Sequence, residues 1–215
     1  EEWFSDGYVS HLDGWTEWLE SRNHRRILLR LRCAGVGSGR LLDVGIGSGG
    51  FLSAARRVGF EVEGCDVSPV ICANARARLG ITVHEGGMDG IPRGLRFDIV
   101  TMHHVLEHTG DPLHLLRQAR VRLTPGGVLH MAVPNVRCWE AALPGWNCYE
   151  PYHLTYLDAV TAARALRAAG FEVTKTLTYE SFSGWFLAVL RTVAGARLDR
   201  TPSKALRGHV HRGGF

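Results

Sequence analysis

The sequence predicts an α/β fold, a doubly wound and mostly parallel sheet. Short apolar runs alternate with segments of helical spacing along most of the chain, which is typical of parallel sheets. A glycine-rich turn directly follows the first apolar run, at the point where such sheets hold their ligands. Strands are expected at 40–44, 61–66, 81–84, 97–102, 128–133 and 171–178, and helices at 51–58, 69–79, 112–122 and 158–169. Gly170 would close the last helix as a left-handed cap, and Ser183–Val193 fits either a helix or a strand.

The composition indicates one domain of ordinary size, covering residues 1–215. Its 45% apolar content is enough for a sizeable core, which we place at 40–180, with a cap segment at 1–32 and a loosely ordered tail at 196–215. The excess of 25 Lys+Arg over 21 Asp+Glu is too mild to argue for nucleic acid. The five cysteines form no C-x-x-C pair, so neither disulfides nor a thiolate zinc site is expected. No apolar run reaches about 18 residues and no leader opens the chain, so we expect a cytoplasmic protein without a membrane span.

The turn after the first strand combines glycines with an acid. Gly45, Gly47 and Gly50 satisfy the pattern G-x-G-x-x-G, in which glycines let the backbone turn sharply and approach a ligand closely. The helical spacing that follows would aim a helix N-terminus at that ligand. Asp43 precedes the first glycine, and Asp66 ends the next strand about 20 residues on, where ribose hydroxyls are bound in such folds. Together these residues predict a site for a nucleotide-type cofactor.

Four motifs, in this order, resemble those of the class I S-adenosylmethionine-dependent methyltransferases. They are LDVGIGSG at 42–49, GCDVSP at 64–69, FDIV at 97–100 and LTPGG at 123–127. The resemblance covers roughly residues 40–173 and implies a Rossmann-like sheet that binds S-adenosylmethionine and releases S-adenosylhomocysteine. An NAD-dependent oxidoreductase also carries G-x-G-x-x-G, but it has no reason to combine an acid before the first glycine with a Pro-Gly-Gly turn before the fifth strand.

The resemblance implies roles for the residues around the glycine turn. The methionine end of the cofactor would lie over Gly45, Gly47 and Gly49. Asp43 would lie near its ammonium group, and Asp66 would bind the ribose diol. The two acids therefore match the positive charge of the cofactor.

The adenine end of the cofactor is less well defined by the resemblance. Val67 would lie against adenine. Many relatives have an aspartate after the third strand, where this chain has Gly87, so Met88 and Asp89 are the remaining candidates for the adenine contact. His103 completes the cofactor-binding set, although alternation along the strand would turn it toward packing.

The segment that follows the fourth strand is rich in histidine. His104, Glu107 and His108 match the H-x-x-E-H pattern of some zinc hydrolases, but here the pattern straddles a strand end instead of lying within a long helix. The ubiquinone-biosynthesis O-methyltransferases, which this region resembles, have E-x-x-E-H there and are associated with a divalent cation. His104 replaces the first glutamate, and the motif lacks a further partner nearby, so we expect no metal. Glu107 and His108 could also simply form the first turn of a helix.

An aromatic insertion follows the fifth strand. Its side chains suit the binding of a planar or apolar small-molecule acceptor, or alternatively a small core of their own. The residues are Trp139, Trp146, Tyr149, Tyr152 and His153. The pattern Pro-Tyr-His-Leu at 151–154 recurs in relatives, where the histidine faces the active cleft.

Both ends of the chain carry basic residues. The cap segment is rich in aromatic residues and continues into a basic amphipathic helix at 17–32. This segment could pack on the sheet, cover the cofactor or lie on a membrane surface. The arginines of 197–215 could contact phosphate or belong to a loose terminus. Nucleic-acid base methyltransferases that act on exocyclic amines have a D/N/S-P-P-Y-like sequence after the fourth strand, and this chain has none there.

These observations predict an S-adenosylmethionine-dependent methyltransferase that acts on a small molecule, with aromatic compounds among the candidate acceptors. O-methylation is favoured, with N- and C-methylation open. His153 is the expected general base, and His104 the expected orienting group, because neutral imidazole can accept the proton that an alcohol or phenol loses. The alternatives are an NAD-dependent oxidoreductase and a catalytically silent cofactor-binding relative.

Overall fold

The computed structural model describes residues 14–195, apart from 147, 150–151 and 180–181. The expectations for the first 13 residues and for the tail at 196–215 therefore lie outside the described residues. The described chain divides into two compact units. The first comprises the residues up to Val105 together with His114–Ala132, and the second comprises Leu106–Leu113 and the residues from Val133 onward.

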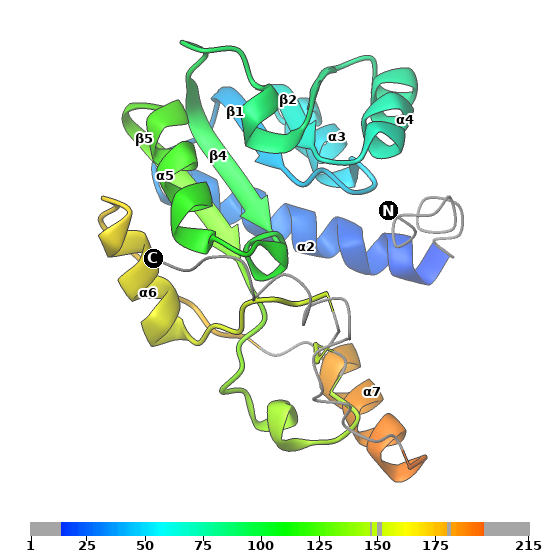
Figure 1. Cartoon of the computed structure of the whole chain (residues 1–215). Coiled ribbons are helices and arrows are strands. Elements are labelled where there is room, and N and C mark those ends of the chain that lie inside the picture. Colours follow the sequence, from blue (N-terminus) through cyan, green and yellow to red (C-terminus); the bar gives the residue numbers. More distant parts are fainter. Residues whose placement is uncertain (1–13, 147, 150–151, 180–181, 196–215) are drawn as a thin grey trace. The chain divides into compact units, whose positions relative to one another are not determined.

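The first unit is built on a parallel sheet of five strands (Figure 1). In chain order these are β1 (Gly39–Val44), β2 (Phe60–Asp66), β3 (Thr82–Glu85), β4 (Phe97–His103) and β5 (Leu123–Ala132). Their order across the sheet is β3-β2-β1-β4-β5, and every pair is parallel. The chain direction across the sheet reverses between β1 and β4. In open parallel sheets this switch point is where ligands bind, beyond the carboxyl ends of the strands.

Helices cover both faces of this sheet (Figure 1). They are α2 (Gly14–Cys33), α3 (Gly50–Arg57), α4 (Pro69–Leu79) and α5 (Pro112–Arg122), with a short 3₁₀ turn η1 (Gly87–Gly90) after β3. The main apolar core joins α2, α3 and α4 to one face, through residues such as Leu31, Leu52 and Cys72. Helix α5 lies on the opposite face from α2 and α3. The periodic apolar runs of the sequence are thus buried on the sheet.

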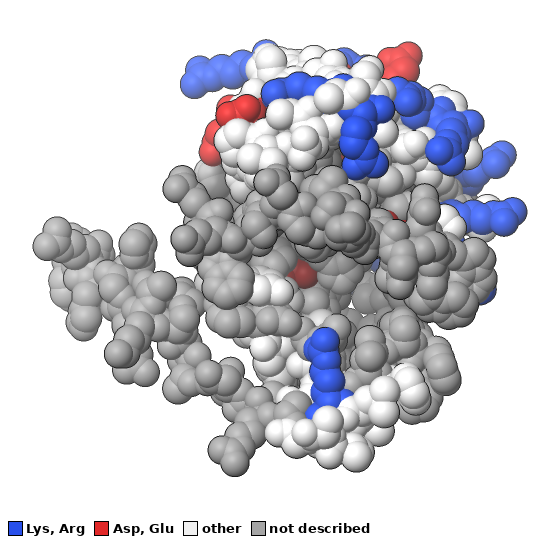
Figure 2. Space-filling model, turned by 90° about the vertical axis from the view of Figure 1, so that its right-hand side faces the viewer, with Lys and Arg blue, Asp and Glu red and all other residues white. Residues whose placement is uncertain are grey.

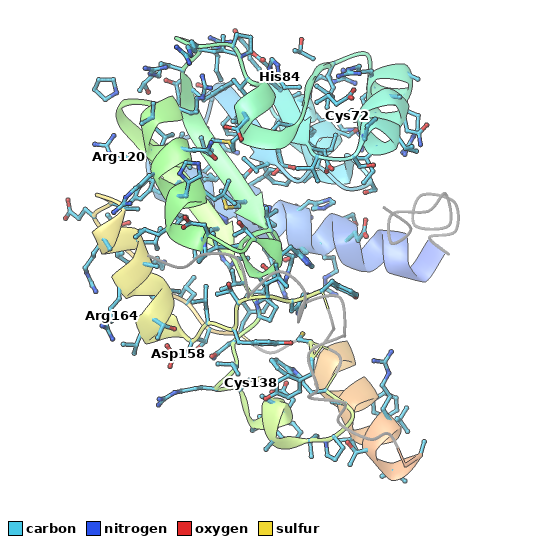
Figure 3. The ribbon with its side chains drawn as sticks, in the orientation of Figure 1. Cys72, His84, Arg120, Cys138, Asp158 and Arg164 are labelled. Carbon is cyan, nitrogen blue, oxygen red and sulfur yellow. The ribbon has the colours of Figure 1, made fainter. Side chains whose placement is uncertain are left out.

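The second unit contains two further helices and two 3₁₀ turns. The turns are η2 (Leu106–His108) and η3 (Trp139–Ala142), and the helices are α6 (Ala159–Ala168) and α7 (Phe182–Val193). Asp158 caps α6 through a capping box, in which its carboxylate accepts from the Thr161 amide at 2.7 Å (Figure 3). A Cβ on Gly145 would lie 2.4 Å from the Ala188 carbonyl, so the backbone before Trp146 packs directly on α7.

The structure confirms the predicted parallel α/β fold and corrects its end. The first five expected strands and all four expected helices form, and Gly170 has the left-handed φ of 87° expected of a cap. The strand expected at 171–178 is wrong, because this segment has no regular structure. Its alternating pattern suits a strand, but a strand also needs a neighbour for its backbone hydrogen bonds, and none pairs with it in the described chain. The ambiguous segment at 183–193 is helical, as part of α7. Within the described residues, no helix is long and apolar enough to cross a membrane.

The contact between strand β2 and the glycine turn provides a test of the fold. A Cβ on Gly64 would lie 2.5 Å from Cγ2 of Ile46 and 3.0 Å from Cδ1 of Leu52. We expect Gly64→Ala to lower the free energy of unfolding by about 1–3 kcal/mol, as for other overpacked cores, and to displace the turn. Chemical denaturation measures the effect. Gly37→Ala is the control, because its Cβ would meet open space. Equal stability of the two variants would contradict this packing.

Candidate active site

The glycine turn lies at the carboxyl end of β1 and contains three left-handed residues. Gly45, Gly47 and Gly49 have φ angles of 71°, 50° and 73°. The Gly45 amide donates to the Cys65 carbonyl at 2.8 Å, and a Cβ on Gly45 would lie 2.5 Å from Cγ2 of Val105. No atom lies within 4 Å of the corresponding point on Gly47. The turn is therefore packed at its first glycine and open at its second, as expected of a loop that approaches a ligand.

Asp43 is buried at the end of β1. Its side chain is 4% exposed, and Oδ1 accepts a hydrogen bond of 2.6 Å from Thr101 Oγ1 on the neighbouring strand β4. Burial raises the pKa of this carboxyl to about 7, against the lowering effect of the Thr101 hydrogen bond. Near neutral pH the group is thus poised between its two protonation states. A cation beside it would favour the charged form.

Asp66 ends β2 and is held by the backbone of the neighbouring turn. The Ser68 amide donates to its Oδ1 at 2.9 Å. Burial raises the pKa of Asp66, and backbone amides, that of Ser68 first and that of Gly47 next, oppose the rise. The hydrogen bond from the Gly47 amide links Asp66, at the end of β2, to the glycine turn that follows β1.

The expected adenine residues lie around the end of β2 and the turn η1. Val67 is 70% exposed, and its Cγ1 would lie 3.2 Å from a Cβ on Gly87. Met88 is buried. The Asp89 carboxylate accepts a hydrogen bond of 2.6 Å from Gln118 on α5, so it ties η1 to that helix. The exposed side chain of Val67, next to Asp66 in the chain, therefore lies near the buried Gly87.

His103 lies in a cluster of rings that sequence analysis did not foresee. Its ring meets Phe51 edge-on at 5.2 Å, and its Nε2 lies 2.9 Å from Nδ1 of His130 on β5. His24 of α2 also meets Phe51 edge-on, at 5.8 Å. Burial lowers the pKa of His103 to about 3 and that of His130 to about 4, so both rings are neutral at physiological pH. The alternation of side chains along β4 did indicate this packed position.

His104 has an unusual backbone conformation. Its φ is 55°, and it is the one non-glycine residue with a positive φ in the described part of the chain. The backbone amide donates to the Ala132 carbonyl at 2.9 Å, which anchors this conformation to the end of β5. Such residues cost about 1 kcal/mol or more and often occur at functional sites.

Glu107, His108 and His153 come together in the second unit. Each offers one possible metal-ligating atom, and these atoms lie within 4.8 Å of one another. The Glu107 carbonyl accepts from the Leu154 and Thr155 amides at 2.7 and 3.1 Å, which holds the histidine segment against η2. The expectation that the histidine motif has no further partner nearby is therefore wrong for Glu107 and His108. The partner is His153, which lies 45 residues later in the chain.

Both histidines of this group are oriented by backbone carbonyls. Nδ1 of His153 lies 2.8 Å from the Cys148 carbonyl, and Nδ1 of His108 lies 3.3 Å from the Tyr152 carbonyl. A carbonyl can only accept, so Nδ1 is the donor in each pair. In the neutral ring the proton is then on Nδ1, and Nε2 keeps its lone pair. Such a nitrogen can act as a base or bind a metal ion.

Rings of the aromatic insertion surround His153. His108 stacks on Tyr152 at 5.5 Å and meets His153 edge-on at 4.7 Å. Tyr156, which sequence analysis did not single out, lies 6.2 Å from His153 and 5.6 Å from Tyr149. Trp146 is buried against Tyr149, whereas Trp139 is 48% exposed on η3. The insertion therefore provides a continuous set of ring contacts with His153 among them.

Asp43 provides a test through its effect on stability. Because its pKa is raised, the folded protein holds this proton more tightly than the unfolded chain, and the free energy of unfolding falls as pH rises from about 4 to about 7. His103 and His130, with lowered pKa values, act in the opposite direction, so the difference between variant and parent must be measured.

Asp43→Asn keeps an acceptor for Thr101 and removes the titration. We expect the free energy of unfolding of Asp43→Asn, relative to that of the parent, to grow between about pH 4 and about pH 7, by up to about 4 kcal/mol. Urea unfolding at several pH values measures it, with Asp89→Asn as an exposed control. A difference in the free energy of unfolding between Asp43→Asn and the parent that does not change with pH would contradict the raised pKa of Asp43.

Comparison with known proteins gives a consistent result. The methyltransferase domain family matches residues 15–176. A probable S-adenosylmethionine-dependent methyltransferase from Mycolicibacterium smegmatis is 30% identical over 161 residues, which are 73% of this chain and 60% of that protein. A ubiquinone biosynthesis O-methyltransferase from Cereibacter sphaeroides is 34% identical over 58% of this chain and 51% of its own length. The chain thus spans between half and three fifths of these two relatives.

Solved structures share the fold. An S-adenosylmethionine-dependent methyltransferase from Mesorhizobium loti has a TM-score of 0.56 at 24% identity, covering 73% of this chain and 82% of that one. A methyltransferase from Haloferax volcanii, solved in complex with the Trm112 methyltransferase activator, has a TM-score of 0.57 at 22% identity, covering 85% and 93%. With the parallel sheet of order β3-β2-β1-β4-β5 and the family match over most of its length, the chain belongs to the S-adenosylmethionine-dependent methyltransferases of the class I fold.

Proposed function

We propose that this chain transfers a methyl group from S-adenosylmethionine to a hydroxyl of a small molecule, with His153 as the general base. The observation that carries the proposal is the Nδ1 contact of His153 with the Cys148 carbonyl, because it leaves Nε2 free to accept a proton among aromatic rings. The name of the Cereibacter sphaeroides relative, an O-methyltransferase, also supports a hydroxyl acceptor.

The residues at the carboxyl ends of β1 and β2 fit the cofactor. Gly47 leaves open space, Asp43 would pair with the ammonium of the methionine end, and Asp66 would accept from the ribose diol. The exposed side chain of Val67 would cover one face of adenine. When bound, the cofactor supplies a methyl group on a sulfonium, which is already activated for transfer. The protein then contributes mainly proximity and orientation.

The aromatic residues around His153 would hold the acceptor. As the methyl group bonds to the acceptor oxygen, the hydroxyl proton passes to Nε2 of His153, and the bond electrons stay with the leaving sulfur. The proton on Nδ1 of His153 remains hydrogen-bonded to Cys148, so the resulting imidazolium keeps its orientation. Aromatic rings such as Tyr152 and Tyr156 would hold a planar acceptor. His104, directly after β4, would orient the reacting groups.

A metal-assisted reaction is the second candidate, favoured by the grouping of Glu107, His108 and His153. A divalent cation there would lower the pKa of an acceptor hydroxyl and replace the base. We retain the expectation that none is needed. EDTA should therefore leave both the melting temperature and turnover unchanged, whereas loss of turnover with recovery on adding Mg²⁺ or Zn²⁺ would favour the metal.

The role of Asp66 can be tested by binding alone. We expect Asp66→Ala to weaken S-adenosylhomocysteine binding by roughly 1.5–3 kcal/mol, because a charged acceptor for the ribose diol is lost. Isothermal titration calorimetry measures the change, and Glu61→Ala, an exposed acid at the other end of β2, should leave affinity unchanged. Micromolar NAD binding without S-adenosylhomocysteine binding would instead favour an oxidoreductase.

The role of His153 can be tested by turnover. Release of S-adenosylhomocysteine is followed with a panel of phenols, alcohols and amines. On the best acceptor, His153→Gln should lower kcat by roughly 10²–10⁴ and remove the fall in activity toward acid pH, because no imidazole remains to be protonated. S-adenosylhomocysteine affinity should stay nearly unchanged.

The outcomes for the other histidines are distinct. His114→Ala, on the surface of α5, is a control that should keep full turnover. If His153→Gln keeps its kcat and His104→Ala loses it, the two roles are exchanged. If both keep it, the reaction proceeds by proximity alone. If no acceptor in the panel is methylated, a catalytically silent cofactor-binding relative gains support.

A further inference from the structure

The connection between β3 and β4 leaves one flank of α5 uncovered. Connections between parallel strands usually contain a helix that packs on the sheet. Here residues 86–96 form only the four-residue turn η1 and an irregular stretch. As a result, Val121 on α5 is 60% exposed, and a groove of about 500 Å³ lies between this stretch and the helix.

Four of the nine residues that line this basic groove are arginines. Arg93 and Arg96 come from the irregular stretch, and Arg117 and Arg122 come from α5. None of its nine lining residues is acidic. No salt bridge among the described residues neutralises Arg93 or Arg117. The carboxylate of Asp89 accepts a hydrogen bond from Gln118 of the lining. On the face of the molecule that Figure 2 shows, Lys and Arg side chains outnumber those of Asp and Glu.

Hydrogen bonds hold the two walls of the basic groove together. The Arg122 guanidinium donates to the Pro92 carbonyl at 2.6 Å and to the Ile91 carbonyl at 2.8 Å. The Gln118 amide donates to Asp89 of η1 at 2.6 Å. The groove is therefore largely formed before anything binds, which lowers the entropic cost of binding.

The lining indicates the chemistry of the occupant. Arginine forks match carboxylate and phosphate groups. The Arg122 fork is already bound to backbone carbonyls, so Arg93 and Arg117 are the side chains that would take an anion. The lining is partly apolar, since it also includes Met88 and Val121. No Trp, Tyr or Phe lines the groove, although such rings are what single-stranded nucleic acids usually stack on. The combination of arginines with apolar side chains suits carboxylates interleaved with aliphatic side chains.

We propose that the basic groove binds an acidic peptide segment of a partner protein, with glutamate or aspartate carboxylates on the arginines and an aliphatic side chain on Val121. None of its arginines is among the residues proposed to bind the cofactor or the acceptor, although Met88 of its lining is a candidate for the adenine contact. Binding there requires neither the acceptor nor turnover.

A synthetic peptide tests the proposal. The probe is a fluorescein-labelled nonapeptide of six glutamates and three leucines, followed by fluorescence anisotropy. We expect Arg93→Glu/Arg117→Glu to weaken binding at least about 10-fold, because attraction becomes repulsion at the centre of the groove. Arg32→Glu/Arg57→Glu, the same charge change at exposed arginines of α2 and α3, should weaken it less than about twofold. Both double variants should keep S-adenosylhomocysteine affinity, which shows that they are folded.

Further binding measurements identify the kind of ligand that the basic groove takes. Val121→Ser should weaken binding of the leucine-containing peptide and leave binding of a nonapeptide made only of glutamate unchanged. Equal losses in the two double variants would overturn the proposal, because attraction would then depend only on net charge. It would also be overturned if a single-stranded oligonucleotide of equal charge bound more tightly and lost that binding in Arg93→Glu/Arg117→Glu, since the groove would then recognise phosphate.

Discussion

The parallel pairing of β1 with both β2 and β4 is the constraint on which the site depends. Because the strands run in one direction, their carboxyl ends meet at one edge of the sheet, and Asp43, Asp66 and His104 all lie at or next to those ends. Register fixes the details. Asp43 is the partner of Thr101 on one side and of Gly64 on the other, so its carboxyl has a hydroxyl donor on β4 and a residue without a side chain on β2.

Burial at this edge has opposite effects on acids and bases. It raises the pKa of Asp43 and lowers the pKa values of His103 and His130, since in each case the neutral form is favoured away from water. The rings of His103 and His130 therefore add no positive charge at this edge of the sheet, and no buried imidazolium there would oppose a cationic ligand.

The parts of the fold that depend on local pattern could be predicted from the sequence, and the parts that depend on long-range contacts could not. Helices α4 and α5 have the predicted bounds, because Pro69 and Pro112 mark their starts and apolar spacing marks the buried face. The segment at 171–178 shows the limit, since alternation does not specify a strand partner. The meeting of His153 with Glu107 is likewise invisible in sequence, because 45 residues separate them. His24 gave no signal either, as a histidine within a basic helix resembles a surface residue.

The left-handed backbone of His104 restricts how this position can vary. A backbone φ of 55° causes no strain in glycine and little in asparagine. It is most costly for valine, isoleucine and threonine. A substitution at position 104 would therefore act on the backbone that directly follows β4 as well as on the chemistry of the side chain.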